Sequence, residues 1–334
     1  MGDHLAGLQA QARRPTEGAD QPLSRRVGIV GAGSIGVAWA VTFARAGWSV
    51  RVVDPDPVRV EAVEAEIQER LGRLDAHGLL GEPVDVVAER VEAGAEQAWA
   101  VGEAELVIEC APERLELKRE VYRAVLESAP GDALLTSSTS ALSPTSLFDG
   151  LAGAERCLVA HPTNPPYLLP VVELVPAGFT AETAVESARE MFAAVGMSPI
   201  LVRSEAEGFV VNRLQGAILR EAYCLLRDGV ASVDEIDLAV RGGLGRRWAL
   251  TGPFETADLN TRGGIASHAE KMGAAYERMG AERGQDDPWT PELVARAEAG
   301  RREILPLDEW GSRVLWRDEQ LMKAEAARRE VDHG

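Results

Sequence analysis

Two residues in one short stretch of the chain have the chemistry of an acid–base pair. His161 follows the apolar run 158–160, and Glu173 lies inside the apolar run 171–175. An ionised carboxylate is costly to bury among valines unless it is paired, and an imidazole is a fitting partner. Such a carboxylate fixes the tautomer of the ring and raises the basicity of its other nitrogen. The spacing leaves a second interpretation open, in which a core histidine and the glutamate pair with unrelated groups.

A hydroxyl is expected close to that imidazole. Ser140 closes the strand-like run 133–140, and His161 lies at the end of the strand-like run 156–162. The carboxyl ends of parallel strands meet at one edge of an open sheet, which is where such sheets bind ligands. We therefore expect Ser140 and His161 to face a common crevice.

A glycine-rich turn has the spacing of an anion-binding loop. Gly31, Gly33 and Gly36 form a GxGxxG pattern directly after the apolar run 27–30 and at the start of a helix expected over 34–46. In dinucleotide-binding folds the first glycine makes a tight turn and the second lets the pyrophosphate approach the backbone. The third lets the helix pack closely on the strand. The pattern therefore predicts a dinucleotide site.

The surroundings of the loop favour NAD as the dinucleotide. Ser34 and Ile35 begin the expected helix, whose N-terminus offers backbone N–H groups and a partial positive charge to a pyrophosphate. Asp54, at the end of the second strand, is placed to accept hydrogen bonds from the adenosine ribose and to repel a 2′-phosphate. Arg51 and Arg59 lie near it in sequence and leave NADP open as an alternative.

The elements that must position these residues alternate between strand and helix in the first part of the chain. Strands are expected at 27–30, 49–54, 104–112, 133–140 and 156–162, and helices at 34–46, 57–76 and 113–128. This alternation is typical of an α/β fold with a Rossmann-type, doubly wound parallel sheet.

After about residue 206 only helical periodicity remains. Helices are expected at 207–230, 232–241, 264–280, 291–303 and 308–330. The sequence therefore predicts a disordered tail at 1–24, an NAD-binding Rossmann domain at 25–205, and an all-α domain for substrate binding and dimerisation at 206–334.

Composition excludes several other classes of protein. The net charge of −18 argues against a nucleic acid or an anionic membrane as the main partner. The uncharged run 27–44 is long enough to consider as a membrane helix, but its glycines indicate a strand, a turn and a helix instead. Cys110, Cys157 and Cys224 have no zinc or disulfide spacing, so we expect a cytoplasmic protein without a metal site.

The sequences of several segments resemble those of a known family. The segments GIVGAGSIG, SSTSAL, AHPTNPP, VVELVP, GFVVNRLQ and GPFET occur in the order seen in the 3-hydroxyacyl-CoA dehydrogenase superfamily. The segments ECAPERLELKRE, SSTSALSPTSLFDGL, GLGRRWALTGPFET and WRDEQLMK are similar to its lambda-crystallin / L-gulonate 3-dehydrogenase branch. The resemblance extends over about residues 27–323.

The resemblance implies an NAD-dependent oxidation of a 3-hydroxyl group. His161 then matches the general base of the family, and Glu173 matches the residue that orients it. Ser140 and Asn212 match the serine and asparagine that hydrogen-bond the reacting oxygen. These four residues are the expected catalytic set, and the same serine and asparagine are expected to bind substrate.

Further roles also come from the resemblance. The family's nicotinamide-side contacts fall on Glu113 and Lys118, and Arg247 matches an arginine that could anchor a substrate carboxylate. An arginine that only caps a helix end is the alternative for Arg247. The expected substrate is a small hydroxy acid of the L-gulonate kind. Apart from the resemblance, the length of the helical domain leads us to expect a homodimer formed through it. A 3-hydroxyacyl-CoA thioester, or a non-catalytic crystallin-like or NAD-sensing role, are the alternatives.

Overall fold

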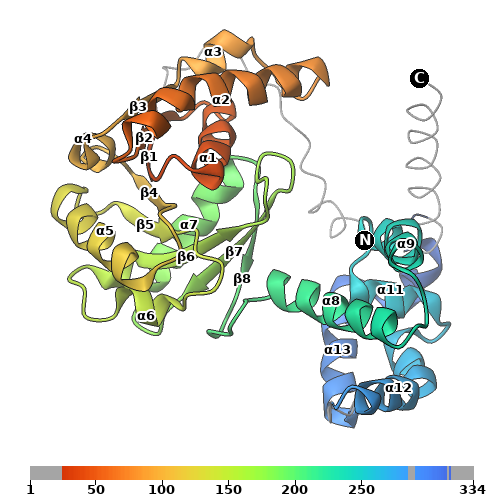
Figure 1. Cartoon of the computed structure of the whole chain (residues 1–334). Coiled ribbons are helices and arrows are strands. Elements are labelled where there is room, and N and C mark those ends of the chain that lie inside the picture. Colours follow the sequence, from red (N-terminus) through yellow and green to blue (C-terminus); the bar gives the residue numbers. More distant parts are fainter. Residues whose placement is uncertain (1–24, 285–289, 314–315, 317–334) are drawn as a thin grey trace. The chain divides into compact units, whose positions relative to one another are not determined.

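The computed structural model describes residues 25–284, 290–313 and 316. The expected tail at 1–24 and most of the helix expected at 308–330 therefore lie outside the described residues. The chain forms two compact units, Met1–Ile218 and Leu219–Gly334 (Figure 1). They divide within helix α8 (Val211–Arg227), after the point near residue 206 where the sequence pattern changes.

The first unit is built on one sheet of eight strands in the order β3-β2-β1-β4-β5-β6-β7-β8. Neighbouring strands are parallel except for β6 and β7, which are antiparallel. The strands are β1 (Arg26–Val30), β2 (Ser49–Val53), β3 (Val91–Gly94), β4 (Leu106–Glu109), β5 (Leu134–Ser137), β6 (Cys157–Pro162), β7 (Val171–Pro176) and β8 (Ser198–Leu201). The predicted doubly wound sheet is confirmed, and β3, β7 and β8 extend it.

Helices cover both faces of this sheet (Figure 1). They are α1 (Ser34–Arg45), α2 (Pro57–Ala76), α3 (Val84–Ala88), α4 (Gln97–Val101), α5 (Leu115–Ser128), α6 (Pro144–Phe148) and α7 (Glu182–Ala194), with the 3-10 turn η2 (Ala154–Arg156). Between the sheet and α1, α2 and α7, Trp39, Phe43 and Phe192 pack with ring centroids 5.4 to 6.0 Å apart. On the α5 and α6 side, Tyr122 meets Phe148 edge-on at 4.8 Å.

The alternation of side chains along the strands brings polar groups to one face. Val107 of β4 and Val159 of β6 belong to the core on the α5 and α6 side of the sheet. Side chains two residues apart in a strand share a face, so Glu109 and His161 lie on that side as well. Glu173 is directly opposite His161 in the β6–β7 register. The carboxyl ends of the central strands therefore carry buried polar groups on one face.

The second unit is helical, as the sequence predicts. Its elements after α8 are α9 (Val233–Leu238), the π-helical η3 (Ala239–Leu244), α10 (Gly245–Trp248), α11 (Pro253–Asn260), α12 (Gly264–Glu282), α13 (Pro291–Ile304) and the 3-10 turn η4 (Leu307–Glu309). Asp258 is fully buried, accepts from the Ile265 N–H at 2.9 Å and pairs with Arg302, which ties α11 to α12 and α13. In the described part of the chain, no helix combines the length and apolar character needed to cross a membrane.

Candidate active site

His161 and Glu173 form a hydrogen-bonded pair at the junction of β6 and β7. The Nδ1 atom of His161 lies 2.7 Å from the Oε2 atom of Glu173. Glu173 is fully buried and His161 is 8% exposed. The antiparallel register that places the two residues opposite each other accounts for the short distance. With Nδ1 engaged, the Nε2 atom of the ring is left for another partner.

The second oxygen of Glu173 accepts hydrogen bonds from the backbone at the start of helix α8. Its Oε1 atom accepts from the backbone N–H groups of Val210 at 2.7 Å and Val211 at 3.0 Å. Burial by itself raises the pKa of the Glu173 carboxyl, but the hydrogen bonds from His161, Val211 and Val210 outweigh it and hold the pKa below its ordinary value. The carboxylate is therefore ionised at neutral pH, at a helix N-terminus that favours negative charge.

A left-handed turn orients those two N–H groups toward Glu173. Gly208 has φ of +76°, and Phe209 is a non-glycine residue with φ of +50°. A bulky residue in this region is strained, and such strain persists only where the surroundings fix it. The Phe209 side chain is 2% exposed, and its ring centroid lies 5.6 Å from that of His161. The same packing thus holds the turn and one side of the imidazole.

Ser140 and Asn212 are joined by a hydrogen bond. The amide Nδ2 of Asn212 donates to the carbonyl oxygen of Ser140 at 3.2 Å. Asn212 directly follows the residues that cap Glu173, so the contacts run without a break from His161 through Glu173 and the start of α8 to the Ser140 loop. The structure therefore brings all four expected catalytic residues into one connected set.

Glu113 holds the other side of the Ser140 loop. Its Oε1 atom accepts from the backbone N–H groups of Ser140 at 3.0 Å and Ala141 at 3.1 Å, and from the Thr139 hydroxyl. Burial raises the pKa of the Glu113 carboxyl, but the Thr139 hydrogen bond, the charge of Lys118 and the two N–H groups leave it below its ordinary value. Glu113 is thus an ionised carboxylate that orders the loop.

A buried ion pair that the sequence reasoning missed lies behind this loop. Lys118 is 1% exposed, and its Nζ atom lies 2.8 Å from Glu109 Oε1 and 3.5 Å from Glu113 Oε2. Glu109 is fully buried, and its Oε2 atom accepts from the Ser137 hydroxyl at 2.6 Å. Burial raises the pKa of the Glu109 carboxyl, although the charge of Lys118 and these hydrogen bonds lower it. The sequence signal that could have revealed this pair is a glutamate at the end of the otherwise apolar strand LVIE.

The glycine loop has the shape that a pyrophosphate requires. Gly31 has φ of +111°, and a Cβ atom on Gly36 would lie 1.9 Å from the Gly31 carbonyl oxygen. Gly33 is the N-cap of α1 without a side-chain cap, and a Cβ atom there would meet nothing within 4 Å. Open space at an uncapped helix N-terminus fits a bound phosphate group, so Gly33 with the N–H groups of Ser34 and Ile35 would hold the pyrophosphate of NAD.

Asp54 and Arg59 both contact the residue between the first two loop glycines. Asp54 Oδ2 accepts from the Ala32 N–H at 2.8 Å, and the Arg59 Nε–H donates to the Ala32 carbonyl oxygen at 3.1 Å. Arg51 is engaged elsewhere: its guanidinium donates to the Trp99 carbonyl at 2.8 Å and pairs with Glu103 at 3.2 Å. Of the two arginines near Asp54 in sequence, only Arg59 is held at the loop.

Arg247 lies in α10 of the second unit. Its carbonyl oxygen accepts from the N–H groups of Leu250 at 3.0 Å and Thr251 at 2.8 Å, and its role as a carboxylate anchor stays a prediction. In the described residues, no group of three or more His, Cys, Asp or Glu side chains is arranged to hold a metal ion. Burial raises the pKa of the Cys110 thiol to about 12, so it is protonated and a poor nucleophile.

The geometry defines a class of protein. A glycine-rich dinucleotide loop on a Rossmann-type sheet, with a carboxylate-paired imidazole at a strand end of the same sheet, is typical of an NAD-dependent oxidoreductase. The family model described as the NAD-binding domain of 3-hydroxyacyl-CoA dehydrogenase matches residues 26–206, and the model of its C-terminal domain matches residues 208–306. The chain belongs to the 3-hydroxyacyl-CoA dehydrogenase family, whose members are NAD-dependent and act on 3-hydroxyl groups.

Relatives support the lambda-crystallin branch of that family. Lambda-crystallin from Oryctolagus cuniculus is 35% identical over 303 residues, which cover 89% of this chain and 94% of the relative. An L-carnitine dehydrogenase from a Pseudomonas species is 34% identical over 86% of this chain and 90% of its own. The solved structure of an NAD+-dependent dismutase, 5-formyl-3-hydroxy-2-methylpyridine 4-carboxylic acid 5-dehydrogenase, superimposes with a TM-score of 0.69 at 27% identity. It covers 86% of this chain and 98% of that one.

The Glu173 contacts predict a pH-dependent contribution to stability. Glu173→Gln is expected to lower the free energy of unfolding at pH 7 by about 1–3 kcal/mol, because a buried charged acceptor is lost. The folded-state pKa of Glu173 is depressed, so this contribution is present above the unfolded value of about 4.3 and disappears as the pH falls through the folded pKa. Urea unfolding at pH 7 and near pH 3.5 measures it.

The gap between wild type and Glu173→Gln should therefore shrink at the lower pH. Glu186→Gln, on the exposed face of α7 where Glu186 pairs with Arg189, is the control and should leave stability unchanged at both pH values. A gap that stays constant or widens on acidification would contradict the assignment of an ionised Glu173.

Proposed function

We propose that the protein oxidises the 3-hydroxyl of a small free hydroxy acid with NAD, with His161 as the general base. The observation that carries the proposal is the 2.7 Å contact between His161 Nδ1 and a buried, ionised Glu173. This contact leaves Nε2 as the ring atom that can accept a proton. Ser140 and Asn212, which are joined to each other by a hydrogen bond, are the proposed partners of the substrate oxygen.

Oxidation of a secondary alcohol removes a proton from oxygen and a hydride from carbon. His161 accepts the hydroxyl proton at Nε2, and Glu173 stabilises the imidazolium that forms, because its Oε2 atom faces Nδ1–H. When bound, NAD supplies the hydride acceptor. Ser140 and Asn212 hold the oxygen by hydrogen bonds while the carbonyl develops, and Phe209 keeps the ring from rotating by packing beside it.

The remaining proposed cofactor contacts lie around the loop that carries Ser140. Glu113 is held at that loop, on the nicotinamide side in the family, while Lys118 contacts it from the buried side. Asp54 is the proposed acceptor for the adenosine ribose hydroxyls. Both assignments support a cofactor site along the carboxyl ends of β1, β2, β4 and β5, where open parallel sheets bind ligands.

A free acid is the favoured substrate class. The lambda-crystallin relatives and the relative named L-carnitine dehydrogenase cover most of this chain, and L-carnitine is itself a small 3-hydroxy carboxylate. Arg247 is the proposed carboxylate anchor, because a guanidinium binds a carboxylate through two parallel hydrogen bonds. The second candidate is a 3-hydroxyacyl-CoA thioester, favoured by the family membership and by a (S)-3-hydroxybutyryl-CoA dehydrogenase structure that is 29% identical.

A substrate panel tests the proposal. L-gulonate, L-carnitine, 3-hydroxybutyrate and 3-hydroxybutyryl-CoA are each offered with NAD, and NADH formation is followed by absorbance. We expect turnover with a free acid. Arg247→Gln should then raise its KM by about ten- to a hundredfold, the loss of a charge-assisted hydrogen bond, and leave NAD binding unchanged.

The matched control is Arg246→Gln, which changes the neighbouring guanidinium and should leave KM unchanged. Turnover with the thioester alone would favour the second candidate. Tight NAD binding without turnover of any of the four compounds would favour a non-catalytic, crystallin-like or NAD-sensing protein.

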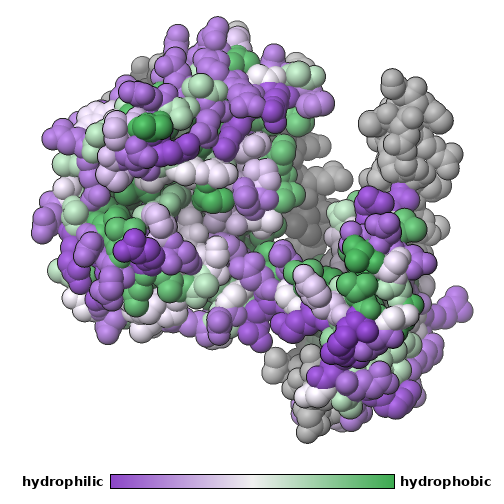
Figure 2. Space-filling view, viewed as in Figure 1, coloured by the Kyte–Doolittle hydropathy of each residue, from purple (hydrophilic) through white to green (hydrophobic). Residues whose placement is uncertain are grey.

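A homodimer in the cytoplasm is part of the same proposal. The described helices of the second unit expose apolar side chains among polar ones (Figure 2). They include Val233, Leu238, Phe254 and Met279. Apolar patches on a helical surface are typical of subunit contacts, and light scattering that reported a monomer would contradict the dimer. The free thiols of Cys110, Cys157 and Cys224 fit a reducing compartment.

A further inference from the structure

One stripe of helix α2 is attached to the glycine loop by two arginines. Arg59 donates to the Ala32 carbonyl oxygen at 3.1 Å, and Arg70 donates to the Ser34 carbonyl oxygen at 3.2 Å. Glu66 lies between them: its Oε1 atom is 2.9 Å from Arg59, and its Oε2 atom is 3.5 Å from Arg70. One glutamate thus holds both guanidinium groups at the loop.

The Arg59 guanidinium and the carboxylate that would bind the adenosine ribose are both attached to Ala32. Asp54 accepts from the N–H of Ala32, and Arg59 donates to the carbonyl oxygen of the same residue. In dinucleotide-binding sheets an acid at this place takes the ribose 2′-hydroxyl, whereas a nearby arginine accommodates a 2′-phosphate. Both kinds of group are present here, yet the arginine has partners within the protein.

We propose that Glu66 is a second determinant of cofactor selectivity, because it holds Arg59 on the Ala32 carbonyl and away from a 2′-phosphate. Asp54 repels the phosphate directly, and Glu66 withholds the cation that would bind it. The inference concerns the chain's own residues toward the dinucleotide, so it does not depend on which substrate is oxidised.

The charges and exposures of the set support this role. Asp54 and Glu66 together balance the charges of Arg59 and Arg70, so a neutral residue at 66 leaves one unbalanced positive charge at the loop. The side chains of Arg59 and Glu66 are 35% and 29% exposed, which leaves Arg59 able to turn toward solvent once Glu66 no longer holds it. Glutamine at position 66 keeps the shape of the side chain and removes its charge.

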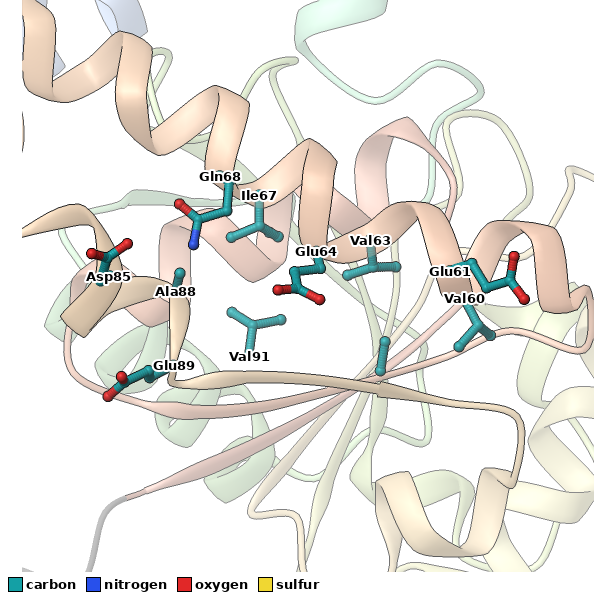
Figure 3. A pocket seen from close by; sticks show the side chains of 11 residues that line it. Val60, Glu61, Val63, Glu64, Ile67, Gln68, Asp85, Ala88, Glu89 and Val91 are labelled. Carbon is teal, nitrogen blue, oxygen red and sulfur yellow. The ribbon is translucent and has the colours of Figure 1, made fainter.

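The opposite flank of α2 provides a contrast. There Glu61, Glu64 and Gln68 line a groove whose other walls include Asp85 and Val91 (Figure 3). Neither Arg59, Glu66 nor Arg70 lines this groove. Acidic residues are therefore spread around α2, and those that do not contact the loop arginines serve as controls.

Calorimetric titration of NAD and NADP, without any substrate, tests the proposal. Asp54→Ser is expected to admit NADP, and Asp54→Ser/Glu66→Gln should tighten NADP by a further factor of about ten while NAD changes by less than about twofold. The control is Asp54→Ser/Glu69→Gln. It also breaks an ion pair of α2 with an arginine, Arg73, but one whose two side chains are 77% and 59% exposed. Relative to Asp54→Ser, it should change the affinity for neither NAD nor NADP.

The source of the gain is tested by a third substitution. Adding Arg59→Met to Asp54→Ser/Glu66→Gln should abolish the tightening of NADP, because the released guanidinium is its cause. The proposal is overturned if the gain survives without Arg59, if Glu69→Gln gives an equal gain, or if NAD tightens as much as NADP. Glu66→Ala provides the same comparison should the glutamine variant fail to fold.

Discussion

Replacement of His161 by alanine is expected to lower kcat by about 10²–10⁴-fold, the usual contribution of a positioned general base. Binding of NAD should be unchanged, because the glycine loop and Asp54 follow β1 and β2, whereas His161 lies at the end of β6. Glu173 would keep its two backbone partners at the start of α8, so the first unit should remain folded.

The experiment compares two readouts for the same variants. Single-turnover formation of NADH with the acid that the substrate panel identifies gives the chemical step, and calorimetry gives NAD affinity. The matched control is His77→Ala, since His77 is an exposed residue at the C-terminal end of α2. A parallel loss of NAD affinity in His161→Ala would show a structural histidine, and an unchanged kcat would remove it from the mechanism.

The second large effect separates two glycines of one motif. Gly33→Val is expected to leave the melting temperature unchanged and to weaken NAD binding by at least about tenfold, or 1.4 kcal/mol. Its side chain would occupy the open space where the pyrophosphate is bound, and the φ of −73° at Gly33 suits any residue. Gly36→Val should instead destabilise the fold, because its Cβ atom would lie 1.9 Å from a backbone oxygen.

Thermal unfolding of each variant, followed by NAD titration of the folded protein, distinguishes the two roles. Gly72→Val serves as a control, since a Cβ atom on Gly72 also meets nothing within 4 Å but lies on α2 away from the loop. Equal losses of stability at Gly33 and Gly36 would contradict the assignment of Gly33 to the ligand. Unchanged NAD affinity in Gly33→Val would contradict it as well.

Much of the sheet could be predicted because its central strands are short apolar runs that end in polar residues. The strand β3 was missed because its sequence, VEAG, is an edge strand with two exposed side chains and little apolar signal. The strand β7 contains a charge, which lowers its resemblance to a buried strand. The same charge indicates that Glu173 needs a partner when it is buried. The glutamate therefore made the strand harder to predict and the site easier to predict.

The supporting contacts of the site could not be predicted from residue types. The N–H groups that cap Glu173 depend on the left-handed turn at Gly208 and Phe209, and a phenylalanine gives no sequence signal for that conformation. The engagement of Arg51 with Trp99 and Glu103 likewise follows from the packing of β2 against α4. Contacts of this kind arise from tertiary structure and are absent from local patterns.

The two oxygens of Glu173 have a consequence for which side chains position 173 can accept. One oxygen faces two N–H donors and the other faces Nδ1–H, so the site requires an acceptor on both ends of a planar group. An amide has an acceptor on one end only. If its oxygen faces the helix, its NH2 group meets the ring, and the imidazole must then carry its proton on the wrong nitrogen. If it is reversed, two donors confront the NH2 group, so no orientation of glutamine reproduces the site.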